Sequence, residues 1–197
     1  MSATTPRPRA VAEHPRAGDR TEGSARTADA ADAYRAAARR WTTGVGVLTT
    51  RSGEDVYAKT VSSLCTLSLD PLLISVAVAA RSPLAAAARA SGRYAVSVLG
   101  AGQEAVARRF AAPGAGHALG LFTQVPMRDD TGVPVLEENV AWFDCRLHTV
   151  LPGGDHTVLV GRVVGSGTTP GDPLLYHEGR YHRLHHHLPT SPTGARE

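Results

Sequence analysis

The feature that most constrains the fold is a change of hydrophobic period at Gly44. Residues 28–44, ADAADAYRAAARRWTTG, are rich in alanine and carry Tyr34 and Trp41 two turns apart, which predicts a helix that ends at Gly44. After Gly44, apolar and polar residues alternate with a period of two, and Gly and Pro interrupt the pattern repeatedly. This pattern predicts a mainly β domain, with a few short peripheral helices, whose strands close into an antiparallel barrel.

Turn and cap residues place the individual segments. Gly53 predicts a hairpin between strands at 45–50 and 56–64, and Pro71 marks a corner before Leu72–Val78, a run expected to be buried on both faces. Ser82 and Pro83 begin a short helix that Gly92 ends. The other expected elements are strands at 93–99, 141–151 and 156–167, a helix at 103–110, an irregular segment at 111–138 and a hairpin around Gly179 at 174–184.

The composition fits one globular domain with polar extensions. The chain has 197 residues, of which 42% are hydrophobic and 20% are charged. Residues 1–29 have almost nothing to bury and are predicted to be a disordered N-terminal extension. Residues 30–184 are predicted to form the domain, and residues 185–197 a flexible C-terminal tail.

The composition also disfavours several kinds of partner. The net charge is +3, but only 5% of residues are aromatic and no Lys/Arg block is interleaved with them, so no nucleic acid is expected. No apolar run approaches the roughly 18 residues of a membrane span, so no membrane is expected. Because two cysteines are too few for a disulfide framework and the N-terminus lacks an apolar signal core, we expect a cytoplasmic protein with reduced thiols.

Three further motifs have ordinary structural interpretations. The segment from Gly100 to Ala105 fits the dinucleotide fingerprint G-x-G-x-x-A, but its short helix and the absence of a βαβ setting favour an ordinary loop that begins a helix. HRLHHH at 182–187 has four histidines without a carboxylate or cysteine spaced to complete a closed shell, so no metal site is expected. Cys145 lies in a strand without a nucleophile pattern, and we interpret it as a small buried hydrophobic residue.

A cluster of small hydroxyl side chains lies in KTVSSLCT, residues 59–66. On a strand Thr60 and Ser62 share one face, and Val61 and Ser63 share the other. Such hydroxyls can bind the polar edge of a planar ring or a phosphate, or they can simply form a polar outer face. Ser82 begins a helix whose free N–H groups favour phosphate, although ordinary capping explains it equally well. From the residues alone, the chain is a barrel with a candidate groove for a phosphate or a cofactor.

The order of several segments resembles the short-chain flavin reductase family. These segments are RWTTGVGVLTT, KTVSSLCTLSLDPLLISVAV, RSPLAAAARASGRYAVSVL, QEAVARRFA, PVLEENVAWFDCRL, GGDHTVLVGRVV and PLLYHEGRYHRL, over roughly residues 34–184. The resemblance implies the FMN-binding split β-barrel, a homodimer with flavin sites near the subunit interface, and the use of NADH or NADPH to reduce FMN or FAD. It also implies that the reduced flavin is released to a partner monooxygenase, as in the reductase half of a two-component system.

The resemblance also assigns roles to residues of this chain. His156, in GDH, is the residue expected beside the nicotinamide, with Tyr181 of GRY as its neighbour. Ser82 is expected to contact phosphate, and Phe110 and Ala111 to close over the cofactor. The residues expected along the flavin ring and ribityl chain are Lys59, Thr60, Ser62 and Ser63, followed by the strand end Ala77, Val78 and Ala79.

The residue inventory agrees with this chemistry, because hydride transfer between two bound cofactors needs stacking and orientation rather than a protein acid, base or nucleophile. Lys59 and Leu64 depart from the family pattern, in which apolar and aromatic residues respectively are common, and a cation at Lys59 would favour an anionic flavin or a phosphate. Two alternatives remain open. The first is a flavoprotein with tightly bound flavin that acts directly on an organic substrate, and the second is a non-catalytic flavin-binding protein.

Overall fold

The computed structural model describes residues 22–112, 125–129 and 132–185, with side chains from residue 29 onward. The chain divides into two compact units, Met1–Ala38 and Arg39–Glu197. The helices are α1 (Glu22–Arg39), α2 (Pro83–Ser91) and α3 (Glu104–Ala111). The strands are β1 (Thr43–Gly44), β2 (Gly46–Ser52), β3 (Asp55–Val61), β4 (Cys65–Leu69), β5 (Leu72–Ala79), β6 (Arg93–Val98), β7 (Met127–Arg128), β8 (Val135–Leu136), β9 (Ala141–Gly153), β10 (His156–Thr168), β11 (Leu175–His177) and β12 (Arg180–His182).

Helix α1 has different ends from those that the sequence predicted. It begins at Glu22 and ends at Arg39, before Gly44, because β1 leaves the helix and pairs with β11. The expected apolar stripe is not buried either, since Tyr34 is 74% exposed and Trp41 is 75% exposed. The disorder predicted for residues 1–29 falls mainly on residues 1–21, which lie outside the described residues, and most of the predicted tail does so too.

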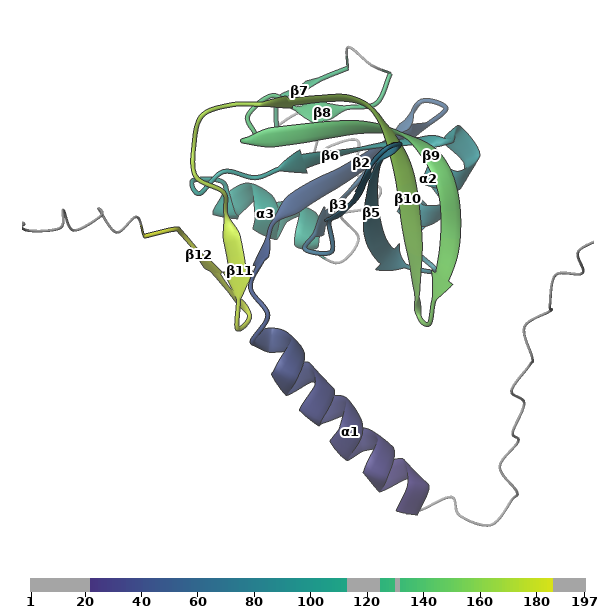
Figure 1. The fold of residues 1–197 in the computed structure, drawn as a ribbon, viewed down its shortest axis with the longest axis vertical. Helices are drawn as coiled ribbons and strands as arrows, with labels where there is room; N and C mark the ends of the chain where they lie inside the picture. The colour runs from purple at the N-terminus through teal and green to yellow at the C-terminus, as the bar shows by residue number, and fades with distance from the viewer. Residues whose placement is uncertain (1–21, 113–124, 130–131, 186–197) are drawn as a thin grey trace, which may run out of the picture. The chain divides into compact units, whose positions relative to one another are not determined.

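The second unit is built on a seven-stranded sheet in the order β3-β2-β6-β9-β10-β5-β4. Every described strand pair in it is antiparallel, as the sequence predicted, and β9 and β10 form a long hairpin. The sheet curls so that β3 lies against β5, where Ser63 hydrogen-bonds to Ala77 (Figure 1). The hydrogen-bonded order begins at β3 and ends at β4, so the ladder stays open at this position.

Strand β5 corrects one expectation about burial. From Leu73 to Val78 its residues alternate between partly exposed and buried, so the strand is fully covered on one face rather than on both. Ile74, Val76 and Val78 belong to the inner core, whereas Leu73, Ser75 and Ala77 stay partly exposed. Period-two alternation of this kind is typical of a strand with one face on the core and the other face open.

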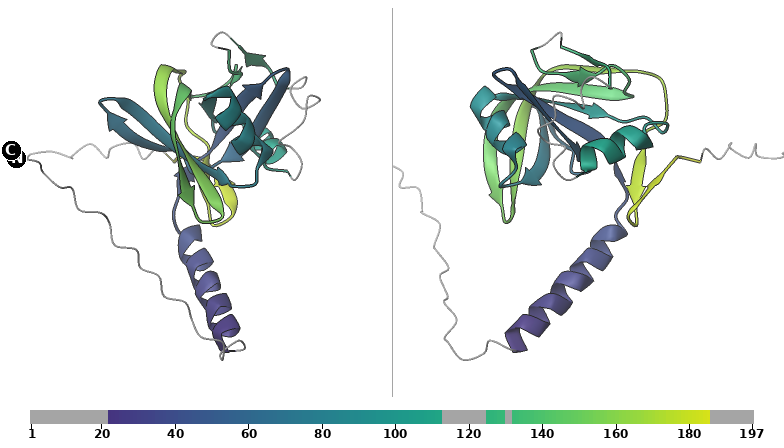
Figure 2. Two further views of the ribbon diagram at one scale, coloured as in Figure 1. Left: turned by 90° about the vertical axis from the view of Figure 1, so that its right-hand side faces the viewer. Right: turned by 180° about the vertical axis from the view of Figure 1, so that it is seen from behind.

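Two hydrophobic clusters lie on opposite faces of β2, which is why that strand is almost wholly buried. Leu48 belongs to the cluster inside the sheet, to which α2 contributes Leu84, Ala85 and Ala88. Val47 belongs to the cluster outside the sheet, to which α3 contributes Ala107 and Phe110. Figure 2 shows the two helices at separate places on the sheet. The two helices therefore pack against opposite faces of β2, with α2 on the inner face and α3 on the outer face.

The short helices and their loops follow the predicted signals. Helix α2 has Ser82 at its N-cap and Gly92 in the left-handed conformation at its C-cap, with φ of 67°. The loop at Gly100 is closed by its own side chains, because the Gly100 N–H donates to the Gln103 amide oxygen over 2.7 Å. Since the described sheet is antiparallel, the interpretation of this segment as a loop that begins a helix is confirmed.

None of the helices that the structure describes is long and apolar enough to cross a lipid bilayer.

Candidate functional site

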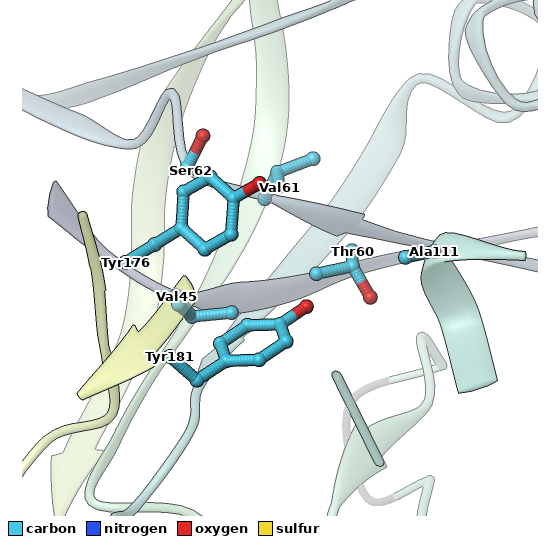
Figure 3. A pocket seen from close by; sticks show the side chains of 7 residues that line it. All are labelled: Val45, Thr60, Val61, Ser62, Ala111, Tyr176 and Tyr181. Carbon is cyan, nitrogen blue, oxygen red and sulfur yellow. The ribbon is translucent and has the colours of Figure 1, made fainter. Parts of the chain in front are cut away.

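A pocket lies where β3, the end of α3 and the β11–β12 hairpin meet (Figure 3). Four of its lining residues were predicted from the sequence, namely Thr60, Ser62, Ala111 and Tyr181, and three were not, namely Val45, Val61 and Tyr176. The pocket thus gathers residues from four segments that lie far apart in the chain. Its mixture of hydroxyl groups, aliphatic side chains and aromatic rings suits a flat, partly polar ligand.

Two side chains of β3 fix the C-terminal end of α3 beside the pocket. The Thr60 hydroxyl donates to the carbonyl of Ala107 over 2.7 Å, and the Lys59 ammonium donates to the carbonyl of Ala111 over 3.2 Å. The carbonyl of Ala111, the last residue of α3, has no partner within the helix, so the Lys59 bond satisfies it. Both side chains therefore position Ala111, and neither hydroxyl nor ammonium is fully free for a ligand.

The predicted hydroxyls divide into two groups. The Ser63 hydroxyl donates to the Ala77 carbonyl over 2.8 Å and accepts from the Ala77 N–H over 3.1 Å, so it joins the end of β3 to β5. The Ser82 hydroxyl makes no capping bond to α2. The Ser62 hydroxyl, on the pocket wall, has no protein partner among the described residues. Ser62 and Ser82 are thus the hydroxyls that remain available to a ligand.

Two tyrosines form the aromatic wall of the pocket. The rings of Tyr176 and Tyr181 lie 5.3 Å apart between centroids and are tilted by 56°. In Figure 3 the hydroxyl of Tyr181 points toward Thr60, and the ring of Tyr176 lies near Ser62. Burial raises the pKa of Tyr181 above its ordinary value, although the positive charge of Arg108 opposes this shift. Tyr181 therefore remains a neutral phenol that can donate a hydrogen bond.

His156 lies away from this pocket. It pairs with Ala79 at the start of β10 and does not line the pocket. Its Nδ1 lies 2.8 Å from the Asp155 carboxylate, and this hydrogen bond lowers the pKa of Asp155. In Figures 1 and 2 the turn before β10 and the β11–β12 hairpin lie on opposite sides of β3 and β5. One chain therefore does not bring His156 together with Tyr181.

Four other predicted residues have more specific positions than the sequence suggested. Ala77 and Ala79 lie on the open face of β5, the same face as His156. Val78 is 5% exposed and belongs to the inner core, so only its backbone can face a ligand there. Phe110 is fully buried in the outer cluster, so its ring supports α3 from below and does not close over the pocket.

Cys145 behaves as the sequence predicted. It is fully buried in the inner core, and burial raises the pKa of its thiol to about 12. It is therefore a packing residue.

The model of the flavin reductase like domain family matches residues 38–185. This chain belongs to the flavin reductase-like family. The match spans all seven strands of the main sheet and every residue that lines the pocket. The pocket described above therefore lies wholly within the matched region.

Relatives of this flavin reductase-like chain have similar lengths. It is 35% identical to the 4-hydroxyphenylacetate 3-monooxygenase reductase component of Thermus thermophilus, over 78% of this chain and 96% of the relative. It is also 35% identical to the NADH:FMN oxidoreductase of Rhodococcus qingshengii, over 76% of this chain and 80% of the relative.

A solved structure has the same fold. The NADH:FAD oxidoreductase SgcE6 of Streptomyces globisporus C-1027, in complex with NAD and FAD fragments, superposes with a TM-score of 0.73 at 30% identity, over 83% of this chain and 96% of that chain. The predicted mainly β split barrel with short peripheral helices is thereby confirmed.

Sequence reasoning missed Tyr176, although a signal for it was present. A two-residue turn at Glu178 and Gly179 places Tyr176 directly opposite Tyr181, and the structure has this register. Pairing residues outward from this two-residue turn would have predicted both aromatic side chains on one face. Val45 had no comparable signal, because its place depends on the pairing of β1 with β11, which lie at opposite ends of the sequence.

Proposed function

We propose that the protein is an NAD(P)H:flavin oxidoreductase that reduces FMN or FAD and supplies the reduced flavin to a partner monooxygenase. The observation that carries this proposal is the pocket, where Thr60, Ser62, Ala111 and Tyr181 come together from separate segments. The family match and the names of the relatives support the same reaction. By family resemblance, Thr60 and Ser62 were expected along the flavin, Ala111 over the cofactor and Tyr181 beside His156.

The donor set of the pocket fits a flavin. When bound, a flavin supplies an acceptor for hydride from a reduced nicotinamide. Ser62 offers a free hydroxyl to the polar edge of the ring, and Val45, Val61 and Ala111 offer apolar surface to its faces. Thr60 and Lys59 hold Ala111 in place, as described above. The protein's contribution is therefore to orient two flat rings, which is worth several kcal/mol when the geometry is right.

We propose that His156 orients the nicotinamide and that Ser82 contacts a phosphate. His156 is half-exposed and hydrogen-bonded to Asp155, which limits the rotation of its ring. The open face of Ala77 and Ala79 leads from the Ser63 bond toward His156. Ala77, Ala79 and His156 therefore share one face of the sheet.

We further propose a homodimer located in the cytoplasm. Exposed leucines lie on β4 and β5, at the edge of the sheet, where Leu69 is 89% exposed and Leu67 and Leu72 are each 50% exposed. A second chain that covers this edge buries them. Both cysteines are free, which fits a reducing compartment.

Anaerobic mixing tests the proposed function. The protein is combined with each of FMN and FAD and with NADH or NADPH, and flavin bleaching is followed by absorbance. We expect bleaching that saturates with added free flavin. Protein that copurifies with flavin and is indifferent to added flavin would instead support the flavoprotein that acts on an organic substrate. Binding without bleaching by either nucleotide would support the non-catalytic alternative.

A further inference from the structure

Arg108 lies at the rim of the pocket on the last turn of α3. Its guanidinium carbon is 5.1 Å from the centroid of the Tyr181 ring, within the range of a cation–π contact. Glu104, one turn earlier, accepts from its Nε over 2.8 Å and from its Nη2 over 2.7 Å. The guanidinium is thus fixed against a wall of the pocket before any ligand arrives, while 65% of its side chain stays exposed.

An ordinary structural role does not account for this arrangement. Basic residues in the last turn of a helix commonly bind its free carbonyls. Here Lys59, rather than Arg108, binds the free carbonyl of the last helical residue, Ala111. The described contacts of Arg108 are with Glu104 and Tyr181, so its charge faces the pocket rim rather than the helix end. An exposed pair one helical turn apart contributes only about 0.3–0.5 kcal/mol to stability.

The charges around the rim favour an anion. Lys59 binds the carbonyl of Ala111, and Arg108 lies over the ring of Tyr181, and both Ala111 and Tyr181 line the pocket. Glu104 is the acidic group that faces Arg108 among the described residues. Guanidinium groups bind phosphate through two parallel N–H bonds, and Arg108 has donors beyond those that Glu104 occupies. The neutral Tyr181 hydroxyl, which points toward Thr60 in Figure 3, can supply another donor inside the pocket.

We propose that Arg108 is a phosphate anchor for the nucleotide that enters the pocket, and that it therefore sets the preference for phosphorylated ligands. This inference rests on the proposed function, since flavin nucleotides and nicotinamide nucleotides both present phosphate. The phosphate has two sources, the ribityl phosphate of FMN and the 2′-phosphate of NADPH. No sequence pattern indicates this role, because Arg108 is one of several arginines in the predicted helices.

The test compares matched ligands with and without the phosphate in question. Dissociation constants are measured at constant ionic strength for riboflavin and FMN by quenching of flavin fluorescence, and for NADH and NADPH by calorimetry. The first variant is Arg108→Met, which keeps a long side chain over Tyr181. The second is Arg108→Lys, which keeps the positive charge but loses the two parallel N–H donors of the guanidinium. Arg35→Met is the matched control, because Arg35 is also 65% exposed and also pairs with an acidic residue of its own helix.

We expect Arg108→Met to weaken the binding of FMN relative to riboflavin, or of NADPH relative to NADH, about tenfold or more. A loss of this size is typical of a charged hydrogen bond. A fall in the FMN to riboflavin preference identifies the flavin phosphate, and a fall in the NADPH to NADH preference identifies the 2′-phosphate. Arg108→Lys should lose less, and Arg35→Met should change neither ratio. If both affinity ratios are unchanged in Arg108→Met, the role of Arg108 is overturned and the proposed function still stands. Wild-type protein that binds no flavin removes the proposed function as well.

Discussion

At the scale of single residues, neighbouring hydroxyls with similar sequence contexts have different roles. Ser62 and Ser63 are adjacent, and both were expected to bind flavin. The structure ties Ser63 to Ala77 through two hydrogen bonds and leaves Ser62 on the pocket wall. Alternation along an extended chain sends adjacent side chains to opposite sides, so one serine serves the fold and the other can serve the ligand.

Replacing each serine separates these roles. We expect Ser62→Ala to weaken flavin binding several-fold and to leave the free energy of unfolding unchanged. Ser63→Ala should lower the free energy of unfolding by about 1 kcal/mol, because the Ala77 backbone groups lose their partner. Flavin titration and urea unfolding measure the two effects. The reverse result, with Ser62→Ala destabilising and Ser63→Ala impairing only binding, would contradict this division.

His156 gives a second test at this scale. We expect His156→Ala to raise KM for the nicotinamide nucleotide about tenfold, through the loss of an orienting contact, while the flavin dissociation constant stays within about twofold. Steady-state kinetics and flavin titration provide the two values. Asp155→Asn, which keeps a hydrogen-bond acceptor beside the ring, is the control and should have a smaller effect. Equal losses for both ligands would count against this role.

At the scale of elements, the long β9–β10 hairpin packs through a glycine. A Cβ at Gly161 would lie 2.4 Å from the Tyr94 hydroxyl and 2.7 Å from the Cys145 Cβ, both in the inner core. The pairing of the hairpin also shifts between Val160 and Gly161, where the register has an irregularity. The strand thus approaches its neighbours more closely here than any residue with a side chain would allow.

Gly161→Ala measures the importance of this approach. We expect the free energy of unfolding to fall by about 2 kcal/mol or more, because the methyl group overpacks the core between β6, β9 and β10. Gly102→Ala is the control, since a Cβ there meets nothing within 4 Å, and its effect should stay within about 0.5 kcal/mol. Thermal and urea unfolding followed by circular dichroism supply the values. Equal stability of the two variants would show that the core yields at Gly161.

The sequence predicted the strands well because their signals are local. Gly53, which lies in the turn between β2 and β3 with φ of 61°, and the caps of α2 each depend on a few neighbouring residues, and both appear in the structure. The end of α1 was wrong because β1 pairs with β11, from the far end of the chain. The burial of Phe110 in the outer cluster had no local signal either, since apolar character alone does not distinguish a residue under a pocket from one over it.

At the scale of the whole molecule, the separation of His156 from the pocket and the exposed edge of the sheet belong together. Leu69 is 89% exposed at the end of β4, the last strand of the main sheet. An uncovered apolar edge strand is a common site of association between chains. The proposed homodimer covers this surface. Its two subunits can also supply to one site the pocket residues and the His156 that lie apart within one chain.

Leu69→Lys tests the dimer. We expect the wild-type protein to sediment as a dimer and the variant to shift toward monomer, because a charged side chain cannot be buried at an apolar contact without a large cost. Analytical ultracentrifugation over a range of concentrations measures the shift. Leu184→Lys, at a leucine that is 42% exposed outside the main sheet, should leave the assembly unchanged. A monomeric wild-type protein would exclude the dimer.

The close contact at Gly161 has an evolutionary consequence. Three strands share one small volume there, so positions 94, 145 and 161 cannot change size independently. A homologous chain with alanine or serine at position 161 should carry a compensating reduction, such as phenylalanine for Tyr94 or alanine or glycine for Cys145. We therefore expect correlated substitutions among these three positions in homologous chains, whichever nucleotide those chains prefer.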